Sequence, residues 1–179
     1  MAVYLDHAAT TPMVPEARAA YVEALDVVGN PSSIHSQGQN ARRMLEEARE
    51  RVAVSLGCDP IEIVFTSGGT ESVKLAIKGL YWARALELGQ SMRILVPCGE
   101  HHATVDTVEW LERHEGAIVE WLPIDELGRI RLDALAAALE HPDDVALITL
   151  LWANNEVGTI QPVSEVVALA AAHGIPVHV

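Results

Sequence analysis

The chain has 179 residues, half of them apolar, so it is long enough to bury a core and too hydrophobic to be disordered. Its net charge of −13 argues against a nucleic-acid or anionic-membrane partner, because both need a basic surface. The N-terminus lacks the features of a secretory signal, no apolar run reaches the ~20 residues of a membrane span, and the two cysteines do not suggest a disulfide framework, which favours a cytoplasmic protein.

Strand-like and helix-like segments alternate along the chain. The expected helices lie at 41–57, 71–89, 103–116, 132–141 and 164–174, and the expected strands at 61–65, 93–97, 117–123, 145–152 and 175–179. Ser164 is a candidate N-cap of the last helix, and Gly174 is expected to end it. This alternation predicts an α/β fold with a largely parallel, buried sheet. The last expected strand is cut at Val179, which indicates a fragment of a longer protein.

Ligands of an open α/β sheet bind beyond the carboxyl ends of its strands. Three polar segments follow expected strands, so we expect them to meet at one edge of the sheet; they read TSGGTES (66–72), CGEHHA (98–103) and ANNEVG (153–158).

The first segment combines two glycines with the start of a helix. The free N–H groups and the positive dipole end of that helix favour an anion, and Thr70 and Ser72 add hydroxyl donors. Neither the P-loop spacing nor G-x-G-x-x-G is present, which weighs against a nucleoside triphosphate or a dinucleotide. The pattern indicates a phosphate site, and a plain strand-to-helix turn is the alternative.

The other two segments carry imidazole and amide groups. His101 and His102, with Glu100 and Cys98 nearby, match no strong zinc signature, so we assign no metal. A histidine face lying against a flat ring is one interpretation, and an exposed loop histidine is the other. The amides of the NNE sequence, residues 154–156, either donate to a ligand oxygen or serve turn chemistry.

Six segments, in order along the chain, resemble the cysteine desulfurases of the NifS/IscS type. These pyridoxal-phosphate (PLP) enzymes have fold type I and belong to the class V aminotransferases. The matching strings are YLDHAATTP (4–12), GNPSSIHSQGQNAR (29–42), EIVFTSGGTES (62–72), EHHA (100–103), NNEVGTIQP (154–162) and IPVHV (175–179). The resemblance implies a three-layer fold, a mostly parallel sheet flanked by helices. It also implies that residues 1–15 belong to a small domain and residues 16–179 to the first part of the PLP-binding large domain.

The resemblance also implies site residues. Gly69 and Thr70 would hold the PLP phosphate, His101 would stack on the pyridine ring and serve in proton transfer, and Asn155 would bond to the phenolic oxygen of the ring. His7 and Ala8 would lie near the substrate, although many family members have Asn in place of His7.

The implied reaction takes sulfur from L-cysteine, giving L-alanine and a persulfide on a cysteine of the enzyme. The sulfur then serves iron–sulfur cluster assembly or tRNA thiolation. The resemblance implies a homodimer with sites near the subunit interface and, as partner, a sulfur-acceptor protein such as an iron–sulfur scaffold. Alternative readings are a selenocysteine lyase or related class V PLP enzyme, and a non-catalytic dimerising fragment.

Some of the family's catalytic groups have no counterpart in this chain. Lys74 and Lys78 are the only lysines, and both lie off the apolar stripe of their expected helix, so we expect solvated side chains. The family's Schiff-base lysine, substrate-binding arginine and persulfide cysteine would follow the last residue. Neither Cys58 nor Cys98 matches the persulfide cysteine. The chain alone is therefore predicted to be inactive.

Overall fold

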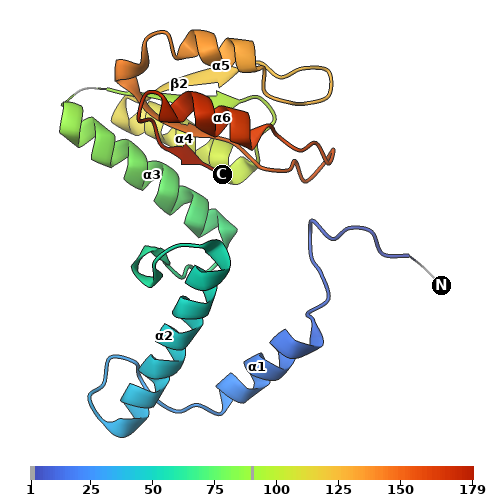
Figure 1. Cartoon of the computed structure of the whole chain (residues 1–179), viewed down its shortest axis with the longest axis vertical. Helices are drawn as coiled ribbons and strands as arrows, with labels where there is room; N and C mark the ends of the chain where they lie inside the picture. Colours follow the sequence, from blue (N-terminus) through green and yellow to red (C-terminus); the bar gives the residue numbers. More distant parts are fainter. Residues whose placement is uncertain (1–2, 90) are drawn as a thin grey trace. The chain divides into compact units, whose positions relative to one another are not determined.

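A computed structural model describes residues 3–89 and 91–179. The chain divides into two compact units, Met1–Phe65 and Thr66–Val179 (Figure 1), and each is described by itself. The boundary predicted after residue 15, between a small domain and the large domain, refers to the domains of a full-length family member and stays a prediction.

The first unit contains helices α1 (Pro15–Leu25) and α2 (Ser36–Leu56) and the short 3-10 helix η1 (Pro60–Glu62). His35 caps α2, because its Nδ1 accepts the N–H of Gly38 at 3.3 Å. Gly57 ends α2 in the left-handed conformation, with φ of 71°. The sequence pattern predicted α2 only from residue 41 and missed α1, which has no buried residue and therefore no clear apolar stripe.

The strand predicted at 61–65 is wrong. Residues 60–62 form η1, and residues 63–66 belong to no helix or strand of the part of the chain that the structure describes. The Ile61 and Val64 side chains are 90% and 65% exposed. A β-strand needs a neighbouring backbone to satisfy its N–H and C=O groups, and apolar alternation alone does not supply one.

The second unit is a sheet between two pairs of helices. Its helices are α3 (Gly69–Leu88), α4 (His102–Glu115), α5 (Leu132–Ala138) and α6 (Val163–Ala171), and its strands are β1 (Arg93–Pro97), β2 (Ile118–Leu122), β3 (Val145–Thr149) and β4 (Val177–His178). The strand order is β2-β1-β3-β4 and every pairing is parallel, which confirms the predicted fold class.

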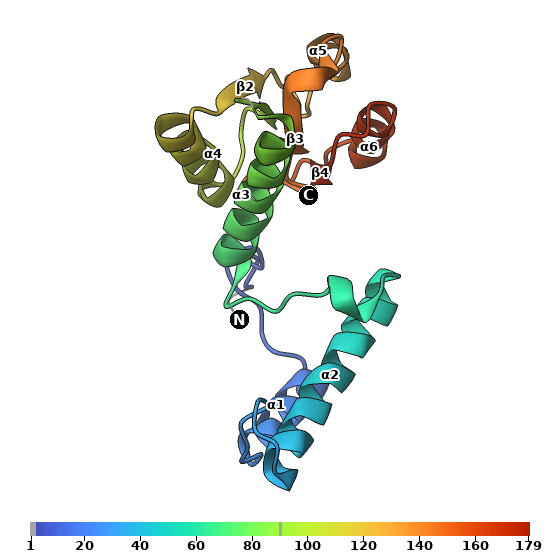
Figure 2. The ribbon, with the colours of Figure 1, turned by 90° about the vertical axis from the view of Figure 1, so that its left-hand side faces the viewer.

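Each face of the sheet has its own core. Helices α3 and α4 lie on one side of the sheet, and α5 and α6 lie on the other (Figure 2). Ile94 and Val96 of β1 pack with Ile77 of α3 and Leu111 of α4 in one cluster. Leu95 of β1 belongs to the other cluster, which includes residues of α5 and α6. Successive strand residues alternate between faces, so one apolar strand can supply both cores. This double burial explains the continuous apolar run of β1.

Some helix ends follow the predictions, whereas the helix predicted at 132–141 already ends at Ala138 and α6 differs at both ends. Gly116 caps α4 with φ of 71°, and the left-handed Gly174 ends the turn after α6. The N–H of Ile175 bonds back to the carbonyl oxygen of Ala170 at 3.1 Å. Ser164 is not the N-cap of α6, because the helix starts one residue earlier and Pro162 occupies the cap position without a side-chain bond.

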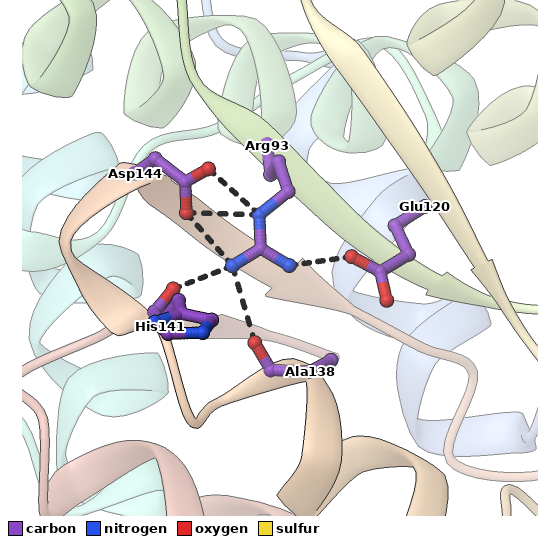
Figure 3. Close-up of polar contacts among 5 residues, drawn as sticks. All are labelled: Arg93, Glu120, Ala138, His141 and Asp144. Atoms are coloured by element: carbon purple, nitrogen blue, oxygen red, sulfur yellow. Dashed lines mark hydrogen bonds and ion pairs between the residues drawn. The ribbon is translucent and has the colours of Figure 1, made fainter.

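Arg93 fastens the amino-terminal edge of the sheet (Figure 3). From the start of β1 its guanidinium contacts the carboxylates of Glu120 and Asp144 and the carbonyl oxygens of Ala138 and His141. The Arg93 bonds lower the pKa of Asp144 and, through the Asp144 contact first, raise the pKa of Arg93. This arrangement lies at the opposite end of the strands from the candidate site.

Candidate functional site

A cleft of about 730 Å³ opens at the carboxyl end of the sheet. Three loops line it, namely 98–102 after β1, 124–128 after β2 and 154–159 after β3. The chain passes from β1 to β2 on one side and returns to β3 on the other, so the cleft lies where the direction of the crossover reverses. Ligands bind at such points in open α/β sheets.

The cleft brings together two of the three predicted segments. His101 and Asn155 both line it, from the loops after β1 and β3. Gly69 and Thr70 do not line it; they lie exposed at the start of α3. The first segment was expected to follow a strand, but residues 63–66 belong to no helix or strand of the described chain, so it is not at a strand end.

His101 is the N-cap of α4, and this fixes its protonation pattern. Its Nδ1 accepts the backbone N–H of Ala103 at 3.0 Å. A nitrogen that accepts a hydrogen bond carries no proton, so in the neutral ring the proton is on Nε2. His101 therefore offers Nε2–H as a donor while its Nδ1 is held by the helix.

The two asparagines after β3 have different surroundings. The Nδ2 of Asn154 donates to the carbonyl oxygen of Gly99 at 3.0 Å, and its Oδ1 accepts the N–H groups of Glu156 at 2.8 Å and Val157 at 3.0 Å. Asn155 is exposed, and no hydrogen bond holds its carboxamide among the described residues. Asn154 thus performs the turn chemistry, and Asn155 is the amide that remains available to a ligand.

Glu100 also links the loop after β1 to the segment after β3. Its Oε1 accepts the N–H of Leu151 at 2.8 Å, while its Oε2 is buried without a well-formed hydrogen bond. Burial raises the pKa of Glu100, and the bonds from Leu151 and Thr104 offset part of that rise. The sequence interpretation treated Glu100 only as a potential metal ligand. The position of Glu100 between the end of a strand and His101 is the sequence feature that could have indicated a structural role.

A second set of bonds ties the loop after β2 to the segment after β3. The buried Gln161 accepts the N–H of Ile130 at 2.9 Å and donates to the Gly128 carbonyl at 2.8 Å. The Thr159 hydroxyl donates to the Leu127 carbonyl oxygen at 2.6 Å. Sequence reasoning did not identify these residues, because the pairs lie some 30 positions apart.

The first turn of α3 has the features of a phosphate cradle. Its leading N–H groups, at Gly69, Thr70 and Glu71, have no intrahelical acceptor. A Cβ placed on Gly68 or on Gly69 would meet no atom within 4 Å, so the space beside this backbone is open. The residues present therefore fit a phosphate group held by backbone donors at a helix N-terminus.

Two hydroxyls of this turn are already engaged. Ser72 Oγ lies 2.6 Å from Thr66 Oγ1, and either hydroxyl can be the donor of this bond; donation by Ser72 to a ligand stays a prediction. The Ser67 N–H and hydroxyl bond to the Glu71 carboxylate, and these bonds lower the pKa of Glu71. Within the described residues the hydroxyl of Thr70 carries no such bond, so it remains available as a side-chain donor of the turn.

His7 and Ala8 lie in a turn of the first unit, so the structure does not associate them with the cleft. The Tyr4 ring is 5.3 Å from the His7 ring in an edge contact. The Tyr4 hydroxyl closes the turn with bonds to the carbonyl oxygens of Asp6 at 2.8 Å and Thr10 at 3.1 Å. A role for His7 and Ala8 beside the substrate stays a prediction.

The lysines do not line the cleft. Lys74 is exposed, as expected. Lys78 is half-buried, with its Nζ 3.3 Å from the centre of the Trp110 ring, so the expectation of a solvated side chain is wrong there. Among the described residues no three metal-ligating side chains cluster, and no helix has the length and apolarity to cross a bilayer.

The fold and the cleft are typical of open α/β proteins, which bind ligands where the direction of the crossover connections reverses. Residues 3–179 match the family described as Aminotransferase class-V, and the chain belongs to that family. Members of this family use PLP.

Individual relatives agree. The chain is 51% identical over 175 residues to an IscS-like cysteine desulfurase of Mycobacterium tuberculosis, covering 98% of this chain and 44% of the relative. A cysteine desulfurase IscS of Dictyoglomus turgidum is 42% identical over 177 residues, covering 98% of this chain and 43% of the relative. The chain thus spans less than half the length of these relatives.

Solved structures show the same fold. A NifS-like protein matches with a TM-score of 0.89 and 34% identity, covering 99% of this chain and 48% of that one. A structure described as SspA in complex with cysteine matches with a TM-score of 0.85 and 34% identity, covering 98% and 49%.

Proposed function

We propose that this chain is the cofactor-binding part of a PLP-dependent cysteine desulfurase, which takes sulfur from L-cysteine and gives L-alanine and an enzyme persulfide. The observation that carries the proposal is the helix N-terminus at Gly69–Thr70, an open anion cradle in a chain whose relatives are named cysteine desulfurases. The solved neighbour described as a complex with cysteine supports the choice of substrate.

Each residue would have a distinct role. The N–H groups that begin α3 and the Thr70 hydroxyl would hold the phosphate, aided by the positive end of the helix dipole. Asn155 would donate its free amide to the phenolic oxygen. When bound, PLP supplies an electron sink that stabilises negative charge on the substrate carbon. The imidazole of His101 would lie against the ring.

The tautomer of His101 bears on its part in proton transfer. With Nδ1 bonded to the Ala103 N–H, the neutral ring holds its movable proton at Nε2. In this tautomer the neutral ring offers Nε2–H as a hydrogen-bond donor, and it has no free lone pair to take up a proton while Nδ1 holds the Ala103 N–H. A part for His101 in proton transfer would therefore require the bond to Ala103 to open.

The cleft of this chain supplies neither the Schiff-base lysine nor the persulfide cysteine that the reaction needs. Lys74 and Lys78 do not line the cleft, and the Lys78 ammonium is held by Trp110, so neither is suited to bind PLP covalently. Cys98 lines the cleft and Cys58 does not, but neither matches the family's persulfide cysteine. The 179-residue chain alone is therefore expected to produce no sulfide from L-cysteine.

The assembly would follow the family. We propose a homodimer in the cytoplasm that delivers sulfur to an acceptor protein such as an iron–sulfur scaffold. Residues 1–15 would belong to the small domain, with His7 and Ala8 near the substrate.

Pyridoxamine 5′-phosphate tests the proposal directly, because it carries the phosphate and the ring but needs no lysine. In a titration of the isotope-labelled chain, we expect amide shifts at Gly69, Thr70 and Glu71 and ring shifts at His101. Replacing Thr70 by Val should weaken binding, while Thr10→Val in the first unit should not. Shifts confined to other residues would reject the site. In parallel, sulfide release from L-cysteine by this chain would reject its predicted inactivity.

A further inference from the structure

The loops that carry His101 and Asn155 extend past the end of the ladder between their strands. The pairing of β1 with β3 ends at Leu95 and Ile148. Backbone bonding between the two strands therefore does not set how far His101 lies from Asn155. Side chains must hold the two loops together.

Two side-chain bonds perform this task. The Asn154 amide donates to the carbonyl oxygen of Gly99 at 3.0 Å, and the Glu100 carboxylate accepts the N–H of Leu151 at 2.8 Å. In both bonds the donor lies after β3 and the acceptor after β1, but the bonding side chain comes from the β3 side in one case and from the β1 side in the other. Gly99, at φ of 96°, has a backbone conformation that few other residues adopt, and it turns the chain between the strand and His101.

Asn154 is fully committed to this task. Its side chain bonds to Gly99, Glu156 and Val157, its N–H donates to the Thr159 carbonyl at 2.8 Å, and its own carbonyl accepts the Gly158 N–H at 2.9 Å. With these groups bonded inside the protein, Asn154 shapes the loop and leaves the next residue, Asn155, facing the cleft.

We propose that Asn154, supported by Glu100, is a positioning residue that sets the spacing between His101 and Asn155. The inference rests on the proposed function, because the roles of His101 and Asn155 come from it. Asn154 itself would touch neither cofactor nor substrate.

Asn154→Asp is the sharpest variant. A carboxylate can still accept the N–H groups of Glu156 and Val157, but it cannot donate to Gly99, so only the cross-link is lost. Asn155→Asp is the matched control, since it makes the same chemical change one residue further on, where no protein bond is broken.

Hydrogen exchange of the ligand-free chain separates the two variants. In Asn154→Asp we expect changed ring signals of His101 and amide exchange up to about tenfold faster at Cys98 and Leu151, whose N–H groups are hydrogen-bonded beside the lost cross-link. In Asn155→Asp these signals should match the unmodified chain. Unchanged exchange and ring signals in Asn154→Asp would overturn the inference.

Binding of pyridoxamine 5′-phosphate supplies the functional reading. Both variants should bind about tenfold more weakly, Asn155→Asp because a direct contact is lost and Asn154→Asp because the two contacts are misplaced. Full affinity in Asn154→Asp would overturn the positioning role. Failure of the unmodified chain to bind would instead reject the proposed function, while hydrogen exchange would still decide whether Asn154 fixes the loops.

Glu100 gives a second, independent pair in case Asn154→Asp does not fold. Glu100→Gln keeps an oxygen that can accept from Leu151, whereas Glu100→Ala removes it. We expect faster exchange at Leu151 and weaker pyridoxamine 5′-phosphate binding in the Ala variant only. Equal behaviour of the Ala variant and the unmodified chain would overturn the role of this bond.

Discussion

The guanidinium of Arg93 and the carboxylate of Asp144 form a fork at the amino-terminal edge of the sheet, with Arg93 Nε 2.8 and 2.9 Å from the two carboxylate oxygens. The pair joins the first residue of β1 to the residue before β3. Because β1 and β3 are the central strands, this contact fixes where the ladder between them begins.

Replacing Arg93 by Met should destabilise the second unit by about 2–4 kcal/mol, since two carboxylates and two carbonyl oxygens would lose their donor. Urea unfolding measures the loss. Arg129→Met is the matched control, because that side chain is exposed and forms no ion pair among the described residues, and its effect should stay within ~0.5 kcal/mol. Equal stability of the two variants would contradict the structural role of Arg93.

Stability should fall on mild acidification because of His178. Its Nδ1 lies 2.8 Å from the Thr149 hydroxyl oxygen, and burial lowers the pKa of His178 below its ordinary 6.5. Below pH 6.5 the unfolded chain therefore binds a proton that the folded chain does not, so the free energy of unfolding decreases as the pH drops. One such group contributes at most about 1.4 kcal/mol per pH unit.

The substitution His178→Asn isolates this effect. The carboxamide can replace Nδ1 as the partner of Thr149 but does not titrate, so stability between about pH 7 and 5.5 should depend less on pH. Glu100 acts with the opposite sign, because its raised pKa stabilises the folded state most below pH 4.5 and less as the pH rises. An unchanged pH slope in His178→Asn would show that His178 does not carry the effect.

Replacing glycine by alanine should lower the stability at one position and raise it at another. A Cβ on Gly38, near the start of α2, would lie 2.4 Å from the Ser33 carbonyl oxygen, so Gly38→Ala should cost about 2 kcal/mol or more. A Cβ on Gly79, inside α3, would meet no atom within 4 Å, so Gly79→Ala should stabilise by about 0.5–1 kcal/mol. Hydrogen exchange of amides in α2 and α3 reports each effect in its own unit. Stabilisation by Gly38→Ala would contradict the close packing of that loop.

The contact between Lys78 and Trp110 should contribute measurably to the packing of α3 on α4. A half-buried ammonium over an indole face contributes roughly 0.5–2 kcal/mol, so Lys78→Met should destabilise by that order and change the Trp fluorescence. Lys74→Met, one turn earlier on an exposed position, should change neither. Equal changes in stability and fluorescence in both variants would contradict a stabilising contact between Lys78 and the Trp110 ring.

Local sequence patterns predicted the second unit well. The strand at 93–97 matches β1 residue for residue, and Gly116 ends α4 as expected. These segments carry their own signals, a doubly buried apolar run in one case and a left-handed glycine after an amphipathic helix in the other. The prediction failed at 61–65, where the pattern was equally apolar, because the outcome there depends on whether another strand lies alongside.

The candidate site was predictable in part. The resemblance pointed to His101 and Asn155, and the structure places both on one cleft. It did not reveal that Asn154 and Glu100 cross-link their loops, because these bonds join residues 51 and 55 positions apart. Nor did it reveal that Ser72 bonds to Thr66, since a hydroxyl near a helix start can serve the turn as readily as a ligand.

The irregularity in β3 has a wider consequence. Opposite the step from Arg93 to Ile94, the third strand holds one additional residue, and Ala146 and Leu147 consequently both face the α3 side of the sheet. Beyond this point Leu147 and Ile148 stay opposite Ile94 and Leu95 across the ladder. Deleting Ala146 would therefore close the bulge and keep both pairs, so the middle of the sheet can lose one residue while the segment that leads to Leu151 and Asn154 keeps its register.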